Sequence, residues 1–295
     1  MKASCPNGCR HKRKFGFYKR KTGRLKRVPR YICRDFGRTF SKLKGTLRYR
    51  QRKPHINQKL FRYLGRGISQ RVCAEFIGVH RTTIARRVKV FGELCRKLNK
   101  KMPSQLKTKS AYFDEMETFE HTKLKPLSIA LAVTKERHIL SVKVSRMPAK
   151  GRLTAISLKR YGYRKDERAK GLSALLKEVK TKAPELIDIS SDECPRYPRQ
   201  VREILKDVNH LTFKGRRACV AGLGELKVGG FDPLFPLNHT CAMYRDNLKR
   251  LSRKTWCTTK DPKRLQDLTD LYARFHNQRI AGIKRLARID SATRK

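Results

Sequence analysis

The chain has 295 residues, a net charge of +50 from 74 basic and 24 acidic residues, and 38% hydrophobic residues. This hydrophobic content can build a packed core, which excludes wholesale disorder, and no run approaches the ~18 apolar residues of a membrane span. The amino terminus has no apolar secretory segment, so we expect a cytoplasmic protein. A charge of this size indicates a large anionic partner. We expect nucleic acid rather than a membrane, because the charge is spread along the whole chain.

The charge is concentrated in the first third of the chain. Residues 1–100 hold 31 basic and 3 acidic residues, whereas residues 101–295 hold 43 and 21. We therefore expect a binding module at the start and, in the rest, enough acidic residues to place some in a site. The nine cysteines, in a chain without a secretory segment, argue against disulfides.

The first forty residues have the pattern of a zinc ribbon. A close cysteine pair precedes two strand-like runs, 15–18 and 30–33, and the second run ends in another cysteine. Two close pairs of soft ligands can surround Zn²⁺ tetrahedrally, but Phe36 stands where the fourth cysteine belongs, so His11 would have to supply the missing donor. The alternative is a ribbon that has lost its zinc and remains a basic hairpin. We therefore predict a basic module over 1–45 with the zinc ligands Cys5, Cys9, His11 and Cys33.

Residues 46–100 have the pattern of a helix-turn-helix domain. Apolar residues at helical spacing predict three short helices, with Ser69 capping the second and a tight turn at Gly78-Val79 before a basic third. The alternative is an ordinary helical bundle with a solvated basic face. The third helix would present four residues to DNA base edges and two arginines to phosphates: His80, Arg81, Thr82 and Thr83 in the first group, Arg86 and Arg87 in the second.

Residues 108–290 alternate between strand-like and helical segments. Three strand-like runs are followed by helix, strand, helix, strand and further helices, which is the order of an RNase H-like α/β domain with a mixed sheet. Residues 146–170 are rich in Lys, Arg and Gly, and we expect a basic loop there. Asp114 lies at the first strand and Asp192 just after the fourth, so the two carboxylates would face each other. Such a pair can bind Mg²⁺ or Mn²⁺ for phosphoryl transfer, although an acid at a strand end can also be a cap or a solvated residue.

Three segments together resemble the bacterial insertion-sequence transposases of the short-element class, which combine a zinc ribbon, a helix-turn-helix and an RNase H-like DDE catalytic domain. The segments are Asp114-Glu115, the run 191–197, and the run 244–255, which we predict to be one helix. The resemblance implies Mg²⁺-dependent attack on DNA phosphodiesters at a site built from three acids. We expect four cations of the late helix to bind DNA phosphates: Arg245, Arg250, Arg253 and Lys254. The alternative is that they form a solvated basic face.

The third acid of the family pattern falls on Asn238 in this sequence. Asn offers one neutral carbonyl oxygen to a metal, and it is also a good N-cap for a following helix. We therefore predict a catalytic set of Asp114, Asp192 and Asn238. Four other residues could replace the missing acid: Glu225, Asp232, Asp246 and His239.

The sequence as a whole predicts a transposase that binds insertion-sequence ends and transfers DNA strands with Mg²⁺ or Mn²⁺. Its partners would be double-stranded DNA and further copies of itself assembled on DNA, without a membrane, in the nucleoid of a bacterium. Because of Asn238, the alternative is a catalytically disabled, sequence-specific DNA-binding protein derived from a transposase. A third interpretation, a basic ribosome-associated protein, predicts no paired acids at strand ends.

Overall fold

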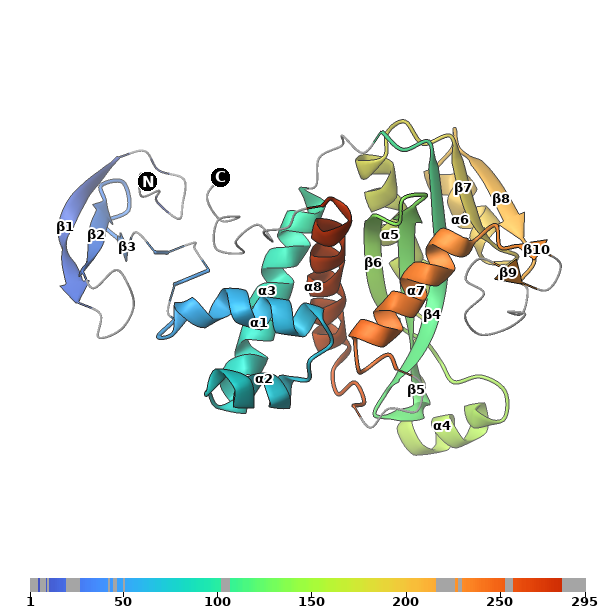
Figure 1. The fold of residues 1–295 in the computed structure, drawn as a ribbon, viewed down its shortest axis with the longest axis horizontal. Helices are drawn as coiled ribbons and strands as arrows, with labels where there is room; N and C mark the ends of the chain where they lie inside the picture. Colours follow the sequence, from blue (N-terminus) through green and yellow to red (C-terminus); the bar gives the residue numbers. More distant parts are fainter. Residues whose placement is uncertain are drawn as a thin grey trace. The chain divides into compact units, whose positions relative to one another are not determined.

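The computed structural model describes residues 5, 9, 11–19, 27–41, 43–44, 47–49, 51–101, 107–215, 226–227, 230–252 and 257–282. The protein is a mixed α/β structure with a five-stranded mixed sheet and a three-stranded antiparallel sheet (Figure 1). It divides into two compact units, one up to Arg62 and one over Tyr63–Lys284. Two of the helices that the sequence placed in a separate 46–100 domain therefore belong to the same unit as the large sheet.

The first unit contains the predicted hairpin. Strands β1 (Lys12–Lys19), β2 (Arg27–Cys33) and β3 (Thr39–Ser41) pair antiparallel in the order β1-β2-β3. Cys5, Cys33 and Phe40 form its small buried cluster, whereas Phe36 is 58% exposed. A short 3₁₀ turn, η1 (Pro54–Ile56), leads into helix α1 (Asn57–Gly65).

Helix α2 (Gln70–Ile77) begins and ends as the sequence predicts, and helix α3 (Arg81–Lys100) begins after the predicted turn but is longer than the predicted short helix. The Ser69 hydroxyl accepts a hydrogen bond from the backbone N–H of Val72, which caps α2. Gly78 ends α2 in the left-handed conformation, with φ of 66°, which a residue with a side chain rarely adopts. Helix α3 then continues for 20 residues.

The large sheet has the strand order β6-β5-β4-β7-β8. Strands β4 (Ser110–Glu120), β5 (Thr122–Thr134) and β6 (Ile139–Arg146) pair antiparallel in succession. Strand β7 (Asp188–Asp192) pairs parallel to β4, and β8 (Asn209–Phe213) pairs parallel to β7. Strands β9 (Leu226–Lys227) and β10 (Gly230–Phe231) form a separate antiparallel pair.

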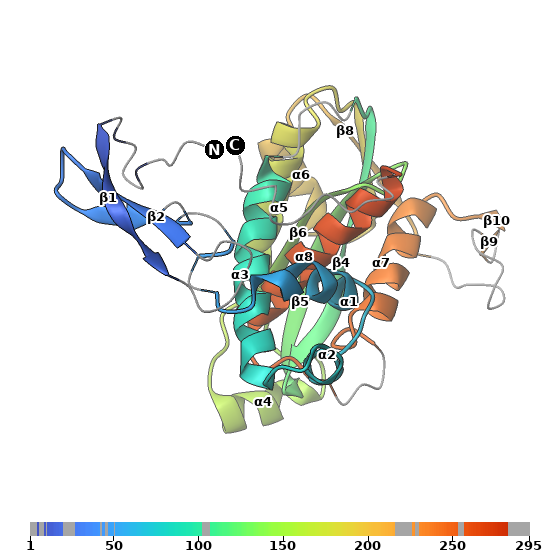
Figure 2. The same cartoon turned by 60° about the vertical axis from the view of Figure 1, so that its left-hand side comes forward.

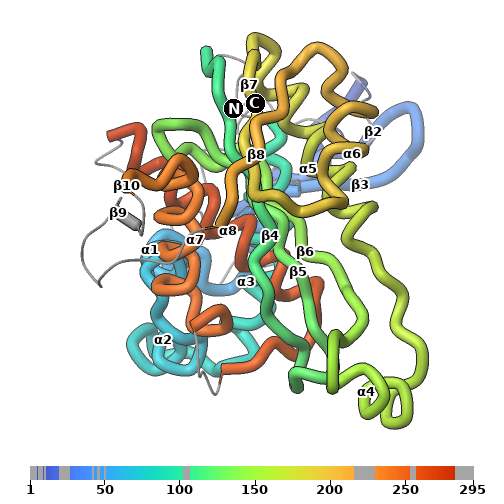
Figure 3. The backbone as a smooth tube through the Cα atoms, turned by 90° about the vertical axis from the view of Figure 1, so that its right-hand side faces the viewer, coloured from blue at the N-terminus to red at the C-terminus, as the bar shows by residue number. Residues whose placement is uncertain are grey.

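Helices pack against both faces of this sheet. On one face, α5 (Arg168–Lys182) and α6 (Tyr197–Ile204) bury a core that includes Ala111, Phe113 and Ile189. Helix α7 (Phe235–Asn247) packs on β4 and β5 from the other side (Figures 2 and 3). Residues 146–170 are not a simple loop, because they contain the helix α4 (Leu153–Tyr161). No helix in the described part of the chain is both long enough and apolar enough to span a bilayer.

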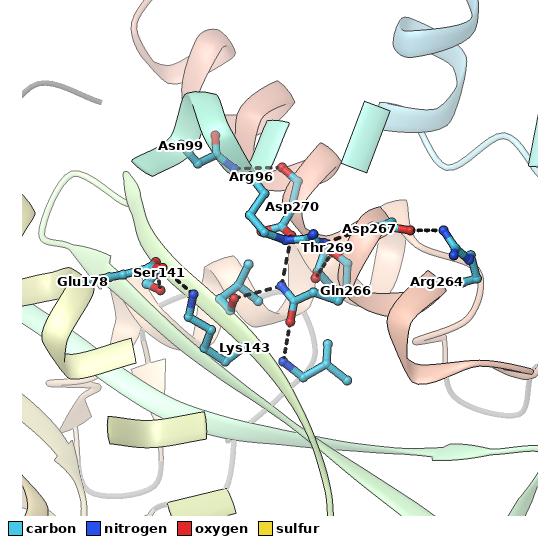
Figure 4. Close-up of polar contacts among 12 residues, drawn as sticks. Arg96, Asn99, Ser141, Lys143, Glu178, Arg264, Gln266, Asp267, Thr269 and Asp270 are labelled. Atoms are coloured by element: carbon cyan, nitrogen blue, oxygen red, sulfur yellow. Dashed lines mark hydrogen bonds and ion pairs between the residues drawn. The ribbon is translucent and has the colours of Figure 1, made fainter. Parts of the chain in front are cut away.

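Helix α8 (Pro262–Ile280) closes the edge of the sheet at β6 with two amide side chains. Gln266 accepts a hydrogen bond from the backbone N–H of Val144 at 2.7 Å and donates one to the carbonyl of Val142 at 3.0 Å (Figure 4). Asn277 forms the same pair of bonds with the N–H and carbonyl of Ile139, at 2.8 and 2.9 Å. The two amides thus satisfy backbone groups that an edge strand would otherwise offer to solvent.

The same helix joins α3 to the sheet. Gly92 of α3 lies so close to α8 that an added Cβ would be 2.3 Å from the Cβ of Asp267, so only glycine allows this approach. Arg96 binds Asp267 at 2.9 Å and Asp270 at 2.8 Å, and the two acids are 4% and 5% exposed (Figure 4). The Asn99 amide donates to the carbonyl of Asp270 at 2.9 Å. The polar contacts therefore fix α3 on α8, and the Gln266 amide fixes α8 on β6.

Candidate active site

Two neighbouring central strands bring Asp114 and Asp192 to the same place. Strands β4 and β7 pair Ser110 with Asp188, Ala111 with Ile189, and Tyr112 with Ser190. Continued by two residues, this register places Asp114 opposite Asp192. Asp192 is the last residue of β7, whereas Asp114 lies in the middle of β4, which runs on to Glu120.

The negative charge of Asp192 affects the ionisation of Asp114. The pKa of the Asp114 carboxyl is raised to about 6, first by burial and then by the negative charge of Asp192. Hydrogen bonds from the backbone N–H of Glu115 (2.6 Å) and from the Tyr197 hydroxyl (3.3 Å) lower the pKa, but they do not outweigh the first two effects. Burial and the charge of Asp192 thus make ionisation of Asp114 more costly, and a bound cation would offset this cost.

The start of helix α6 holds this pair of acids in place. Tyr197, which is buried against the ring of Phe113 at 4.8 Å between centroids, directs its hydroxyl to Asp114. The backbone N–H of Cys194 donates to Asp192 at 3.2 Å. Both contacts come from the 191–197 run whose pattern pointed to the site.

Glu115, next to Asp114, is held away from solvent by an arginine that the sequence analysis did not single out. Arg196 binds Glu115 at 2.6 Å, and the Glu115 side chain is only 6% exposed. The other carboxylate oxygen of Glu115 is buried and has no hydrogen-bond partner among the described residues. Arg196 thus neutralises a third acid beside the pair. Its position in the sequence, directly before Tyr197, was the feature from which its place at the site could have been predicted.

Helix α7 covers the strand that carries Asp114. The negative charge of Asp114 contributes to the raised pKa of the buried Cys241 thiol, so this part of α7 lies close to the carboxylate. Asn238 lies one turn before Cys241 on the same side of the helix. Its amide nitrogen donates to Asp232 at 2.8 Å, and Asp232 also accepts a hydrogen bond from the backbone N–H of Leu234.

The alternative role of Asn238, a helix N-cap, is not what the structure has. Helix α7 begins at Phe235, with Leu234 in the cap position and no described side chain capping the helix. Asp232 accepts a hydrogen bond from the backbone N–H of Leu234, in the turn before the helix. Of the other candidates for the third acid, Asp232 is buried beside Asn238, whereas Asp246 is exposed. His239 contacts Arg137 at 3.1 Å. Glu225 lies outside the described residues.

The prediction of a single helix over 244–255 is also wrong. Helix α7 ends at Asn247, and Leu248 adopts an extended conformation, so that Leu248 and Leu251 can both be buried. Arg245 lies on the helix, whereas Arg250 follows it in a turn and donates to the carbonyl of Thr258 at 3.2 Å. Arg253 and Lys254 lie outside the described residues.

The structure nevertheless brings two of the predicted DNA contacts together. Arg81, at the start of α3, and Arg250 line one cavity of about 520 Å³. Three further cations line it as well: Arg71, Lys249 and Lys260. No acidic residue is among the described residues that line this cavity. Because these cations come from segments about 170 residues apart, no local pattern in the sequence could group them.

The other predicted DNA-reading residues differ in exposure. Arg86 and Thr82 are exposed and Thr83 is half-buried, as a solvent-facing helix surface requires. The exposed His80 caps α3, because its Nδ1 accepts a hydrogen bond from the backbone N–H of Thr82 at 3.3 Å. Arg87 is only 6% exposed, so it does not present its guanidinium to a phosphate as predicted.

In the first unit, three of the four predicted zinc ligands form a cluster. The sulfur atoms of Cys5, Cys9 and Cys33 lie within 4.8 Å of one another and could hold a metal ion. His11 is not part of the cluster: it is 78% exposed and lies 3.5 Å from Asp35. The Asp35 carboxylate also hydrogen-bonds with the Cys9 thiol. Asp35, one residue before the Phe36 that replaces the expected cysteine, therefore lies beside one of the three sulfurs, although like His11 it is not part of the cluster.

We expect the purified full-length protein to retain about one zinc per chain, because three clustered thiolates need only one further donor to complete a tetrahedron. The His11→Ala variant should keep its zinc, whereas Cys33→Ala should lose it and Asp35→Ala should hold it less tightly against a competing chelator. Metal analysis after dialysis measures all four proteins. Zinc lost from His11→Ala but kept in Asp35→Ala would make His11 the ligand after all.

No family model matches this chain, and no curated protein matches it.

Proposed function

We propose that this protein is a transposase, which cleaves DNA phosphodiesters and transfers the resulting ends with a divalent metal ion. The observation that carries the proposal is the pair Asp114 and Asp192. They lie in matching register on neighbouring central strands, and the charge of one raises the pKa of the other. Carboxylate pairs of this kind are the metal sites of two-metal phosphoryl transfer.

Three further features support the proposal. The sheet order, with three antiparallel strands followed by two parallel ones, agrees with an RNase H-like domain. Helix α2, the left-handed Gly78 and helix α3 agree with a helix-turn-helix that has a basic, exposed first turn. The charge of +50 fits a protein that binds a polyanion.

The donor set fits Mg²⁺ or Mn²⁺. Mg²⁺ is usually held by one or two carboxylates together with substrate phosphate oxygens, and the Asp114–Asp192 pair offers two carboxylates that repel each other when both are ionised. When bound there, the ion would polarise the phosphoryl group and activate the attacking oxygen.

The residues around the acids have separate tasks. The Tyr197 hydroxyl orients the Asp114 carboxylate, and the Cys194 N–H orients that of Asp192. Arg196 compensates the charge of Glu115, so that the site carries two uncompensated acids rather than three. Asn238 would supply a neutral oxygen, because its amide nitrogen is already bonded to Asp232.

That last contact favours a second candidate function, a DNA-binding protein that no longer cuts. The amide of Asn238 is engaged with Asp232 and brings no negative charge to the site. A site with only two charged ligands could bind a divalent ion too weakly for catalysis. The DNA-binding surfaces would remain.

The test is a cleavage assay with the full-length protein, Mg²⁺ and labelled duplexes that carry any inverted repeats flanking its gene. The transposase proposal expects nicked or joined products with the wild type that depend on the metal. If the wild type is inactive and Asn238→Glu gains cleavage, the protein is a disabled transposase and the second candidate holds. If neither protein cuts but both bind the duplex, the catalytic interpretation fails.

A further inference from the structure

A second cavity, of about 600 Å³, lies at the far end of the β4–β5 hairpin beside α4. Figure 3 shows α4 beyond the ends of β5 and β6, away from the other helices of this unit. Two aromatic and four cationic side chains line the cavity: Tyr161 and Tyr163, and Lys125, Arg146, Arg164 and Lys165. Its volume is in the range of small-molecule sites, which is ~300–1,000 Å³.

Tyr163 is held in solvent by a fixed segment of the chain. The residue is 84% exposed, the largest exposed fraction among the large hydrophobic residues that the structure describes. Gly162 turns the chain out of α4 with φ of 71° and ψ of −170°, a backbone conformation that glycine adopts readily and residues with a Cβ rarely adopt. Directly after Tyr163, Arg164 binds the carbonyl of Met147 at 3.1 Å and the carboxylate of Glu120 at 3.1 Å. An exposed ring on an anchored backbone loses little conformational freedom when a flat ligand packs on it.

The second ring of the cavity is already in contact with a cation. The Lys125 Nζ lies 4.5 Å from the centre of the Tyr161 ring. This places a positive charge next to an aromatic face, and Arg146 and Lys165 add two more along the same cavity. Of the two lining acids, Glu120 is paired with Arg164, and Glu167 accepts a hydrogen bond from the backbone N–H of Arg146 at 3.4 Å.

We propose that this Tyr161–Tyr163 cavity binds an unpaired nucleotide of DNA, with its base against the exposed Tyr163 ring and its phosphates near Lys125, Arg146 and Lys165. Aromatic platforms flanked by cations are the general way in which proteins hold single-stranded nucleic acid without reading its sequence. Paired bases inside a duplex keep their faces covered by stacking and cannot use such a ring, so the ligand is an unpaired or extruded nucleotide.

The position of the cavity connects it with the candidate active site. Glu120, at the cavity, follows Asp114 by six residues on the same strand. At ~3.3 Å per residue this is about 20 Å, which is the axial length of about six base pairs of a DNA duplex. The identification of DNA as the ligand rests on the proposed function. The cavity would then hold one base, separated from its partner, about six positions from the reacting phosphate.

The test compares two fluorescent single strands of equal length, oligothymidine and an abasic strand with the same phosphates, bound by the full-length protein without divalent metal. The wild type should bind the thymidine strand about tenfold more tightly, which is about 1.4 kcal/mol and within the range for one stacked base. Tyr163→Ala should bind both strands equally, whereas Tyr163→Phe should keep the preference. Lys125→Ala should weaken the binding of both strands by the same factor.

The control variant is Leu158→Ala, which removes an exposed side chain of α4 that does not line the cavity, and its preference should equal that of the wild type. Equal wild-type binding of the two strands, or a preference that survives Tyr163→Ala, overturns the proposal. Asp192→Asn should keep the preference, because the assay reads no cleavage. The cleavage assay therefore tests the catalytic proposal, and the base preference tests the nucleotide-binding proposal, so the failure of one can be told from the failure of the other.

Discussion

Replacing Asp114 or Asp192 with Asn should lower metal-dependent DNA cleavage by about 10³-fold or more. Each substitution removes one of the two charged ligands, and a loss of about 4 kcal/mol of transition-state stabilisation corresponds to that factor. The measurement is single-turnover cleavage of labelled DNA. Asp207→Asn, the same change at an exposed acid outside the site, is the matched control and should keep wild-type activity. Activity that survives both site substitutions would contradict the proposed function.

The pH dependence of metal binding gives the same prediction a second readout. The pKa of Asp114 is raised to about 6, so the folded state holds this proton more tightly than the unfolded state. The carboxyl therefore stabilises the metal-free protein below its unfolded pKa, and this contribution is lost as the pH rises toward about 6. Mg²⁺ should raise the melting temperature above about pH 7 and much less near pH 5, where it competes with the proton. In Asp114→Asn, Mg²⁺ should raise the melting temperature only slightly at both pH values. A rise as large as that of the wild type would mean that the metal binds elsewhere.

Replacing Arg96 with Ala should destabilise the Tyr63–Lys284 unit by about 3–5 kcal/mol. The substitution leaves two buried carboxylates with less compensation, and an unpaired buried charge costs about this much. Asp270 should account for most of the effect, because Arg264 still contacts Asp267. Urea unfolding of the full-length protein measures the change. Arg199→Ala is the control: Arg199 pairs with Glu203 at the surface, with 86% of its side chain exposed, and its removal should cost less than about 0.5 kcal/mol.

The pH again distinguishes a charge effect from a packing effect. Burial raises the pKa of Asp270 to about 6 although Arg96 lowers it, so without Arg96 the acid should become neutral at still higher pH. The stability difference between Arg96→Ala and the wild type should therefore be larger at about pH 8 than at about pH 5. A difference that is equal at both pH values would mean that Arg96 contributes packing rather than charge.

Much of the sheet could be predicted because its signals are local. The strands that carry Asp114 and Asp192 are short apolar runs, and their order along the chain was sufficient to expect the two acids side by side. The Ser69 cap and the Gly78 turn were equally visible, since capping and left-handed glycine depend on a few neighbouring residues.

The errors lie where distant parts of the chain decide the conformation. Helix α7 ends at Asn247 because burying Leu248 and Leu251 outweighs the helical pattern that continues to 255. Arg87 belongs to a basic run, but the structure buries it. His11 was the nearest histidine in the sequence, whereas the fold places Asp35 beside Cys9. The contact of Arg96 with Asp267 joins residues 171 positions apart and leaves no trace in either local pattern.

The amides of Gln266 and Asn277 also limit how copies of this protein can associate. An open strand edge can recruit an edge from another molecule and extend the sheet, which leads to aggregation. Here α8 occupies the hydrogen-bonding groups of β6 at Ile139, Val142 and Val144, so that edge cannot accept a foreign strand there. Copies of this protein that associate must therefore meet through other surfaces, and Gln266→Leu should make the protein more prone to precipitate at high concentration without altering the Asp114–Asp192 site.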